Sequence, residues 1–308
     1  MIQSFTTVFQ QIVILFIMIA VGFVCSKRGM LSPQTIKELS KLIIYVVTPC
    51  LVVESFHRPF NSSMLSNIGI AFAAAIGAHL LNILLSRIFI RDEVQSRRVV
   101  YQFATIFSNC GFMGLPLQYA ILGSDGVFYG AMFIAIFNVF TWTYGFILMG
   151  GLGQRIRLRE IVLNPGILGV AVGFIIFVTS FQIPTILLVP IKSFAALNTP
   201  VPMVVVGYYL AQITTLKVLK DKNLLITTVI KLLAAPLLAL LMFYLAGIRG
   251  LLLTSLVISA SAPSAANTVM FSVLFNRDTK LAVTVVSVSV LISLFTMPLV
   301  ISLAMAIA

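Results

Sequence analysis

Long apolar stretches separated by short polar breaks make up almost the whole sequence. These stretches are long enough for an α-helix to cross the hydrocarbon core of a bilayer, and the breaks carry charged residues, glycine or proline. The pattern predicts an all-α membrane protein of ten transmembrane helices, at residues 8–25, 39–56, 66–89, 99–122, 127–149, 165–181, 186–211, 224–247, 251–274 and 281–306.

Composition excludes a water-soluble enzyme. Of the 308 residues, 60% are hydrophobic and 9% are charged, whereas ordinary globular domains carry about 25% charged residues. The first apolar stretch has no Lys or Arg before it, so it lacks the basic region of a signal peptide and is predicted to be a permanent span. Cys25, Cys50 and Cys110 lie in or beside apolar stretches and are expected to fill space in the core.

The distribution of charge supports the ten-helix topology. A net charge of +12 can indicate a nucleic-acid partner, but the basic residues follow the loops of a membrane protein, so we expect no nucleic-acid partner. Alternate connections hold 16 basic residues against three on the opposite side, which predicts a plasma (inner) membrane protein with both termini on the extracytoplasmic side. The predicted cytoplasmic residues are Lys27, Arg28, Lys37, Lys41, Arg87, Arg91, Arg97, Arg98, Arg155, Arg157, Arg159, Lys217, Lys220, Lys222, Arg277 and Lys280.

The two halves of the sequence, residues 1–150 and 164–308, have matching features. Pro49 lies 151 residues before Pro200, and the interrupted stretches 109–116 and 263–267 are similarly spaced. Five helices per half would make the second half enter the membrane from the opposite side. The sequence therefore predicts two inverted five-helix repeats that form one transporter unit, with broken helices four and nine crossing at its centre.

The two interrupted helices contain the strongest candidate site. Asn109, Gly111, Gly114 and Pro116 belong to the first, and Pro263 and Asn267 to the second. Gly and Pro weaken a helix, and a break inside the membrane persists only where protein or water satisfies its backbone. Half-helix N-termini suit an anion, whereas Asn oxygens and free carbonyls suit a cation. The alternative is a purely structural role, in which proline kinks the helix and the glycines allow close packing.

Three further residues are weaker candidates for substrate binding. Asn198 and Thr199 precede Pro200 in the seventh predicted helix. Lys231 lies inside the eighth, and its long stem is expected to snorkel toward the cytoplasmic interface. The alternative for Lys231 is a counter-charge for an anionic cargo or a conformational lock.

No sequence motif indicates an enzyme. HExxH, GxSxG and Walker A patterns are absent from the sequence, so we expect no metal centre, acyl-transfer nucleophile or ATP hydrolysis. We expect no cofactor, and a gradient would have to supply the energy, with H⁺ or Na⁺ as the possible coupling ion.

Motifs along the whole chain resemble those of the auxin efflux carrier family, which includes plant auxin exporters and bacterial carriers of malonate or malate. They are SKLIIYVVTPCLVV (40–53), SNCGFMGLPL (108–117), FNVFTWTYG (137–145), NPGILGVAVG (164–173), PVPMVVVG (200–207), IKLLAAPLL (230–238) and SAPSAANTVMFSVLFNRD (261–278). The large cytoplasmic loop of many plant members is missing, which is typical of a bacterial member.

The resemblance implies ten helices in inverted repeats with crossing broken helices. It also implies a scaffold of helices one, two, six and seven, through which a homodimer would form. Asn109 matches the family's Asn in helix four, Pro116 and Pro263 match its crossover prolines, and Lys231 matches a Lys often present in helix eight.

These observations favour a secondary transporter, such as a symporter, of small organic anions, namely mono- or dicarboxylates. It would work by alternating access in contact with membrane lipid. Two alternatives remain: a membrane ligand sensor or channel-like protein on the same fold, and a cation/proton antiporter. The antiporter is less favoured because no Asp or Glu occurs near residues 109–116 or 263–267.

Overall fold

The computed structural model describes residues 2–151, 159, 162–212 and 221–308, with side chains described from residue 5. Arg155, Arg157, Lys217 and Lys220 of the predicted cytoplasmic loops lie outside the described residues. Helices account for almost all of the described chain, which contains no strand. The prediction of an all-α protein is therefore confirmed.

Several predicted segments consist of short helices in direct succession, some joined through π-helical turns, which are labelled η. In chain order, the elements are α1 (Ile2–Lys27), α2 (Pro33–Leu42), η1 (Ile43–Val47), α3 (Thr48–Phe56), α4 (Ser62–Phe89), α5 (Gln95–Ile106), η2 (Cys110–Gly114), α6 (Leu115–Phe140), η3 (Thr141–Gly145), α7 (Phe146–Gly150), α9 (Pro165–Thr179), α10 (Thr185–Ala196), α11 (Pro200–Ala211), α12 (Lys222–Val229), η5 (Ile230–Ala234), α13 (Ala235–Leu245), α14 (Gly250–Ser261), α15 (Asn267–Leu274) and α16 (Thr279–Ile307).

Most residues of each predicted segment are helical, but residues 107–109 interrupt the fourth segment, residues 262–266 interrupt the ninth, and α6 covers the end of the fourth and the start of the fifth. Seven described helical runs are long and apolar enough to cross a membrane. One of them, Cys110–Gly150, is divided at Gly123, whose φ of 65° and ψ of −156° interrupt the helix. The protein therefore has several membrane-capable helices, while the number of crossings stays a prediction.

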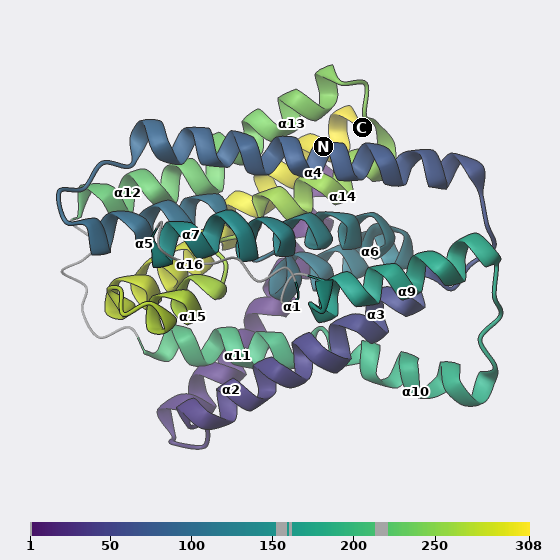
Figure 1. Cartoon of the computed structure of the whole chain (residues 1–308), viewed down its shortest axis with the longest axis horizontal. Helices are drawn as coiled ribbons and strands as arrows, with labels where there is room; N and C mark the ends of the chain where they lie inside the picture. The colour runs from purple at the N-terminus through teal and green to yellow at the C-terminus, as the bar shows by residue number, and fades with distance from the viewer. Residues whose placement is uncertain (1, 152–158, 160–161, 213–220) are drawn as a thin grey trace.

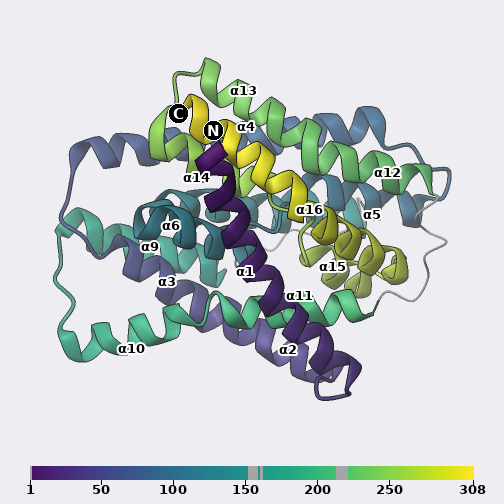
Figure 2. The ribbon, with the colours of Figure 1, turned by 180° about the vertical axis from the view of Figure 1, so that it is seen from behind.

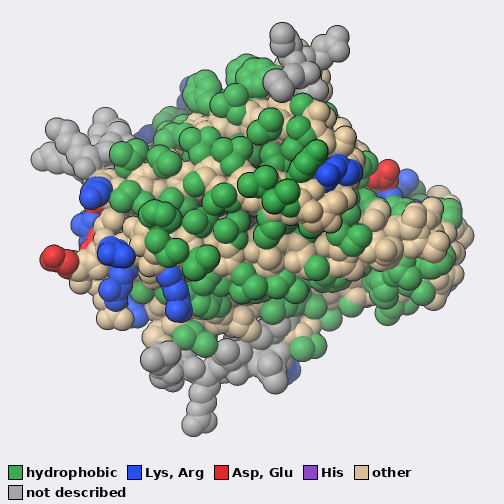
Figure 3. All heavy atoms as spheres, turned by 90° about the horizontal axis from the view of Figure 1, so that it is seen from above, with side chains coloured by type: hydrophobic (Ala, Val, Ile, Leu, Met, Phe, Trp, Pro, Cys, Tyr) green, Lys and Arg blue, Asp and Glu red, His purple; other side chains and the backbone are tan. Residues whose placement is uncertain are grey.

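Most helices run roughly along the long axis of the molecule (Figure 1). α4, α12 and α13 lie along one edge, α2, α3, α10 and α11 along the other, and α5, α6 and α9 between them. α1 crosses obliquely behind them and packs along α11 and α16 (Figure 2). Hydrophobic side chains cover the middle of the face seen in Figure 3, and most charged side chains in view lie toward its two ends, as a bilayer requires.

Polar side chains fix the starts of several helices at the ends of the bundle. Ser32, Asn61, Asn164, Asp221 and Asp278 each accept a hydrogen bond from a first-turn backbone N–H group. These N–H groups have no partner within their own helix. The predicted breaks between apolar segments are therefore also places where helices begin.

Three π-helical turns precede prolines inside the predicted spans. η1, η2 and η5 each end two residues before a proline, which is Pro49, Pro116 or Pro236. Proline has no N–H group and its ring clashes with the preceding turn, so a regular α-helix cannot continue unchanged through it. A wider turn relieves this clash while the chain stays helical. The chain thus stays helical through each of these prolines.

α1 and α11 approach each other at a pair of glycines. A Cβ atom added to Gly207 would lie 2.1 Å from the backbone oxygen of Ile19, and one added to Gly22 would lie 2.4 Å from that of Val204. Such small residues allow helix backbones to approach closely in a membrane, where packing rather than the hydrophobic effect holds helices together.

We expect Gly207→Ala to destabilise the protein by about 1–3 kcal/mol, because the new methyl group meets backbone atoms that have to move apart. Thermal unfolding of the purified protein measures this change. Gly69→Ala is the matched control, since a Cβ atom at Gly69 meets nothing within 4 Å. Equal melting temperatures for the two variants would contradict the expectation.

A charged cluster joins the start of α5 to the start of α12. Arg97 forms ion pairs with Asp92 and with Asp221. The side chain of Asn223 donates to Asp92 at 3.0 Å. Partial burial raises the pKa of Asp221, but hydrogen bonds from the Asn223 backbone and from Arg97, together with the charge of Arg97, outweigh this and hold the pKa below its usual value.

Asp221→Asn is expected to lower stability by about 1 kcal/mol at pH 7, because it removes the charge that Arg97 contacts. A carboxylate with a depressed pKa stabilises the fold above its unfolded-state pKa, and this stabilisation is lost as the pH falls through the folded-state pKa. The difference in stability between the variant and the wild type should therefore become smaller as the pH is lowered. Unfolding measured across pH tests this, with the exposed Glu93→Gln as control.

Candidate functional site

The two broken helices meet at the centre of the molecule and pair with each other. Between α5 and η2 the chain is extended, and it pairs with the break between α14 and α15 through an antiparallel bridge of Ser108 and Ser264. The Asn109 N–H donates to the Pro263 oxygen at 2.7 Å, and the Ala265 N–H donates to the Phe107 oxygen at 2.9 Å. Each break thus provides a carbonyl oxygen for a backbone N–H group of the other.

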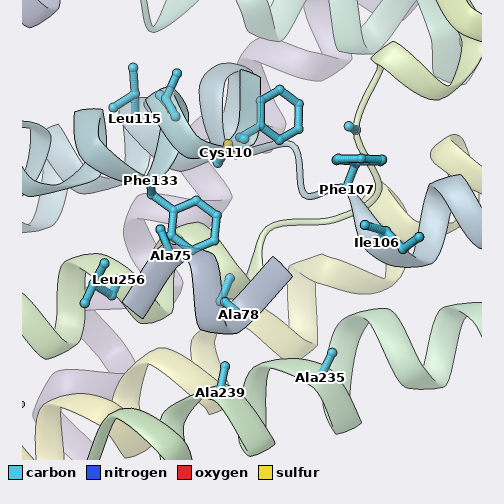
Figure 4. Packing of buried hydrophobic residues seen from close by; sticks show 14 of the residues in the cluster. Ala75, Ala78, Ile106, Phe107, Cys110, Leu115, Phe133, Ala235, Ala239 and Leu256 are labelled. Atoms are coloured by element: carbon cyan, nitrogen blue, oxygen red, sulfur yellow. The ribbon is translucent and has the colours of Figure 1, made fainter. Parts of the chain in front are cut away.

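Further hydrogen bonds hold this crossing in place. The Ser108 hydroxyl donates to the Ala260 oxygen of α14 at 3.3 Å. The Ser264 N–H donates to the hydroxyl of Ser289 in α16 at 3.1 Å. Figure 4 shows the hydrophobic side chains around the first break, with Ile106 and Phe107 before it and Cys110 and Leu115 after it. An apolar shell of this kind strengthens the polar contacts that it surrounds.

Lys231 points to the crossing and does not snorkel to the surface. Its side chain is 0% exposed, and its Nζ donates to the Ser108 hydroxyl at 2.5 Å. The prediction that its stem reaches the cytoplasmic interface is therefore wrong. Lys231 belongs to η5, and α5 and α16 pack against η5. None of the ion pairs in the described part of the chain involves Lys231.

Asn109 lines a small cavity beside the crossing. Its side-chain Nδ2 is buried and has no hydrogen-bond partner among the described residues. The cavity has a volume of about 10 Å³ and is closed by Ala266 and by residues of α11 and α16, including Tyr209 and Ser287. This volume holds about one water molecule. The predicted residue Asn109 thus offers a free donor in a site that is closed in this conformation.

The first break lies earlier in the chain than the glycines and proline predict. Residues from Cys110 onward are helical, so Gly111 and Gly114 belong to η2, and Pro116 lies in the first turn of α6. The expectation of an interruption from Asn109 to Pro116 is wrong, because the π-helical turn accommodates the proline. Gly114 lies beside α14, where an added Cβ atom would make an ordinary van der Waals contact, 3.8 Å from the Cα of Ser259.

The second break matches its predicted position. Pro263 contributes its carbonyl oxygen to the crossing. Asn267 is the first residue of α15, is half-buried and directly follows Ala266, which lines the cavity. Pro263 therefore contacts Asn109, and Asn267 follows a residue of the cavity wall.

Asn198 and Thr199 lie between α10 and α11, away from this cavity. The Asn198 side chain is buried and accepts a hydrogen bond from the Thr48 hydroxyl of α3 at 3.3 Å. Neither residue is among those that line the cavity with Asn109. Their role in substrate binding stays a prediction, and the contact that the structure gives Asn198 joins two helices.

Gln118 is a buried polar residue that the sequence analysis did not single out. Its side-chain nitrogen donates to the Ser255 oxygen at 2.8 Å and to the Ser259 hydroxyl at 2.9 Å, both in α14. Its Oε1 has no hydrogen-bond partner in the described chain. Its position could have identified it, because it is a polar residue directly after the GLPL motif in an otherwise apolar segment. Gln118 ties α6 to α14 on one side of the crossing.

A pair of discontinuous helices that cross inside an all-helical membrane protein is the arrangement in which many secondary transporters hold their substrate. Comparison with known sequences agrees with this class. The family described as "Membrane transport protein" matches residues 7–161 and 152–301 of the chain, so the chain belongs to this family. It is the auxin efflux carrier family that the motifs resemble.

Two archaeal relatives are described as uncharacterized transporters. One, from Methanocaldococcus jannaschii, is 24% identical over 304 residues, which cover 94% of this chain and 96% of the relative. The other, from Methanothermobacter thermautotrophicus, is 24% identical over 292 residues, which cover 92% of this chain and 94% of the relative. The similarity extends over nearly the full length, and family and relatives are transporters rather than enzymes.

Ser108→Ala is expected to lower stability by about 2 kcal/mol, because it leaves the buried Nζ of Lys231 without its hydrogen-bond partner. Lys231→Met should cost less, since it removes the group that needs the bond. The double variant should then be about as stable as Lys231→Met alone. Thermal unfolding of the four proteins tests the coupling, and strictly additive losses would show that the two side chains do not interact.

Proposed function

We propose that this protein is a secondary active transporter of small organic anions, namely mono- or dicarboxylates, which bind at the crossing of the broken helices. The observation that carries the proposal is Lys231, a basic side chain buried at the crossing without an ion-pair partner in the described chain. A buried cation without a counter-charge is costly in a membrane protein. An anionic cargo would provide that charge.

The backbone around the crossing supports an anion over a cation. η2 begins at Cys110 beside the crossing, and the first N–H groups of a helix attract negative charge. The free Nδ2 of Asn109 adds a donor. None of the described residues form a cluster of three or more His, Cys, Asp or Glu side chains that could hold a metal ion. Donors therefore outnumber acidic ligands at this site.

Transport would require the site to open, because the cavity at Asn109 holds about one water molecule and no carboxylate. α11 closes one wall of this cavity and belongs to the scaffold that the family resemblance implies. A movement of the crossing helices against α11 would enlarge the site. Arg58 after α3 also forms an ion pair with Asp125 of α6, and a movement of α6 against α3 would break this contact.

Several parts of the proposal extend beyond the binding site. Alternating access would use inverted repeats 1–150 and 164–308, with both termini outside an inner membrane. H⁺ or Na⁺ would couple transport to a gradient, and two copies would associate through the scaffold helices. A sensor or channel-like protein would bind the same anion without accumulating it.

Uptake of labelled mono- and dicarboxylates into proteoliposomes with imposed H⁺ or Na⁺ gradients tests the proposal. We expect saturable, gradient-driven accumulation in the wild type. Binding without accumulation would favour the sensor, and flux that only equilibrates the anion would favour the channel.

Asn109→Ala is expected to reduce uptake tenfold to a hundredfold, because a hydrogen bond to a charged group contributes about 1.5–3 kcal/mol. Asn109→Asp is nearly the same size and should reduce anion uptake further, since it places a carboxylate in the site. A cation carrier would show the opposite order. Asn67→Ala, on α4 and hydrogen bonded to Tyr129, is the control amide. Unchanged uptake in both Asn109 variants would show that the anion does not bind at the crossing.

A further inference from the structure

A second cavity, whose wall contains no charged residue, lies between α4, α6 and α9. Its volume is about 500 Å³, and each of the three helices contributes four residues to its wall. All twelve are Gly, Ala, Val, Ile, Leu, Met or Phe, so no polar side chain faces the space. An occupant of this cavity would have to be apolar along its whole length.

Contacts between α6 and α9 close the cavity at both ends. One turn beyond one end, the rings of Phe128 and Phe177 lie 5.2 Å apart. At the other end, Asn138 lies against Gly166, where an added Cβ atom would be 2.5 Å from the Asn138 side-chain nitrogen. The length between these contacts is roughly 15 Å at the rise of an α-helix, and the lining residues span roughly 10 Å of it. The occupant therefore cannot enter along the helix axes.

The cavity opens sideways onto the surface of the molecule. Its floor is buried, with Met132 at 0% and Ile68 at 4% exposure, whereas Leu65 and Phe174 at its rim are both 37% exposed. α4 and α6 belong to helical runs that are long and apolar enough to cross a membrane, and α9 is a shorter apolar helix. The opening thus faces the hydrocarbon region of the bilayer.

We propose that this cavity is a binding site for the acyl chain of a membrane lipid. A flexible alkyl chain matches the apolar wall and can enter from the side. The volume argues against a helix from a second copy, because a cylinder 10 Å wide and one helical turn long already fills roughly 400 Å³. The site is independent of the cargo site, and it joins α9 to α4 and α6 through a molecule that the bilayer supplies.

The single tryptophan, Trp142, allows a direct test by fluorescence. In a Trp142→Phe background, Phe72→Trp places a reporter in the wall of the cavity. The protein is reconstituted in phosphatidylcholine vesicles that contain an increasing fraction of acyl chains brominated at mid-chain. Phe295→Trp, 63% exposed on α16, reports bulk lipid, and Phe243→Trp, 1% exposed, reports the protected core.

We expect the fluorescence of the reporter at position 72 to be quenched in proportion to the brominated fraction, because a single acyl chain occupies the site. Phe295→Trp should be quenched more steeply, because several lipids contact it. Gly69→Leu should reduce the quenching at position 72 at least threefold by filling the cavity, and it should fold because its Cβ atom meets nothing within 4 Å.

Two matched variants separate filling of the cavity from a general effect of added bulk. Ala73→Leu adds a similar side chain to the exposed face of α4 outside the cavity and should leave the quenching unchanged. Ala171→Leu fills the cavity from α9 and should act like Gly69→Leu.

Protection of position 72 equal to that of Phe243→Trp would show that protein covers the cavity. If neither Gly69→Leu nor Ala171→Leu reduced the quenching, position 72 would contact bulk lipid and the cavity would not be a binding site. Either result overturns the proposal.

Discussion

Two backbone hydrogen bonds at the crossing are the constraint on which the centre of this protein depends. A broken helix inside a membrane exposes N–H and C=O groups that lipid cannot satisfy, at a cost of several kcal/mol for each group. Here the N–H of Asn109 and that of Ala265 bind carbonyl oxygens of the opposite break. Each break satisfies a backbone N–H group of the other, so residues more than 150 positions apart in the sequence form one structural unit.

The surrounding helices make this pairing possible by combining bends with close packing. π-helical turns let Pro49, Pro116 and Pro236 lie inside long helical segments, so the chain stays helical without exposing many backbone groups. α14 packs against η2 and α6, and Gln118 of α6 reaches Ser255 and Ser259 of α14. These hydrogen bonds place a group of buried polar side chains beside the two broken helices, where function is proposed.

The same arrangement explains why the candidate site is closed. Lys231 is held at Ser108, and the cavity at Asn109 is filled to within about one water molecule by α11 and α16. Polar donors that lie in a closed apolar shell interact strongly with a charge once the shell opens to admit it. A carrier of this design would bind its cargo by moving packed helices, because the interior is too dense to deform gradually.

The sequence by itself determined the helical class, the membrane setting, the family and the approximate position of both breaks. Apolar length and charge distribution depend on the solvent that each segment meets, and Gly, Pro and Asn act locally on the backbone, so these features can be read along the chain. It also placed Asn109 and Pro263 beside each other through the matching spacing of the halves.

Only the tertiary structure decided which way Lys231 points, where the first break begins and which residue Asn198 contacts. Snorkelling and burial use the same long side chain, and the choice between them depends on whether a partner such as Ser108 lies within reach. A π-helical turn before Pro116 likewise depends on how η2 and α6 pack against α14. These outcomes are set by contacts between distant segments, which local sequence does not contain.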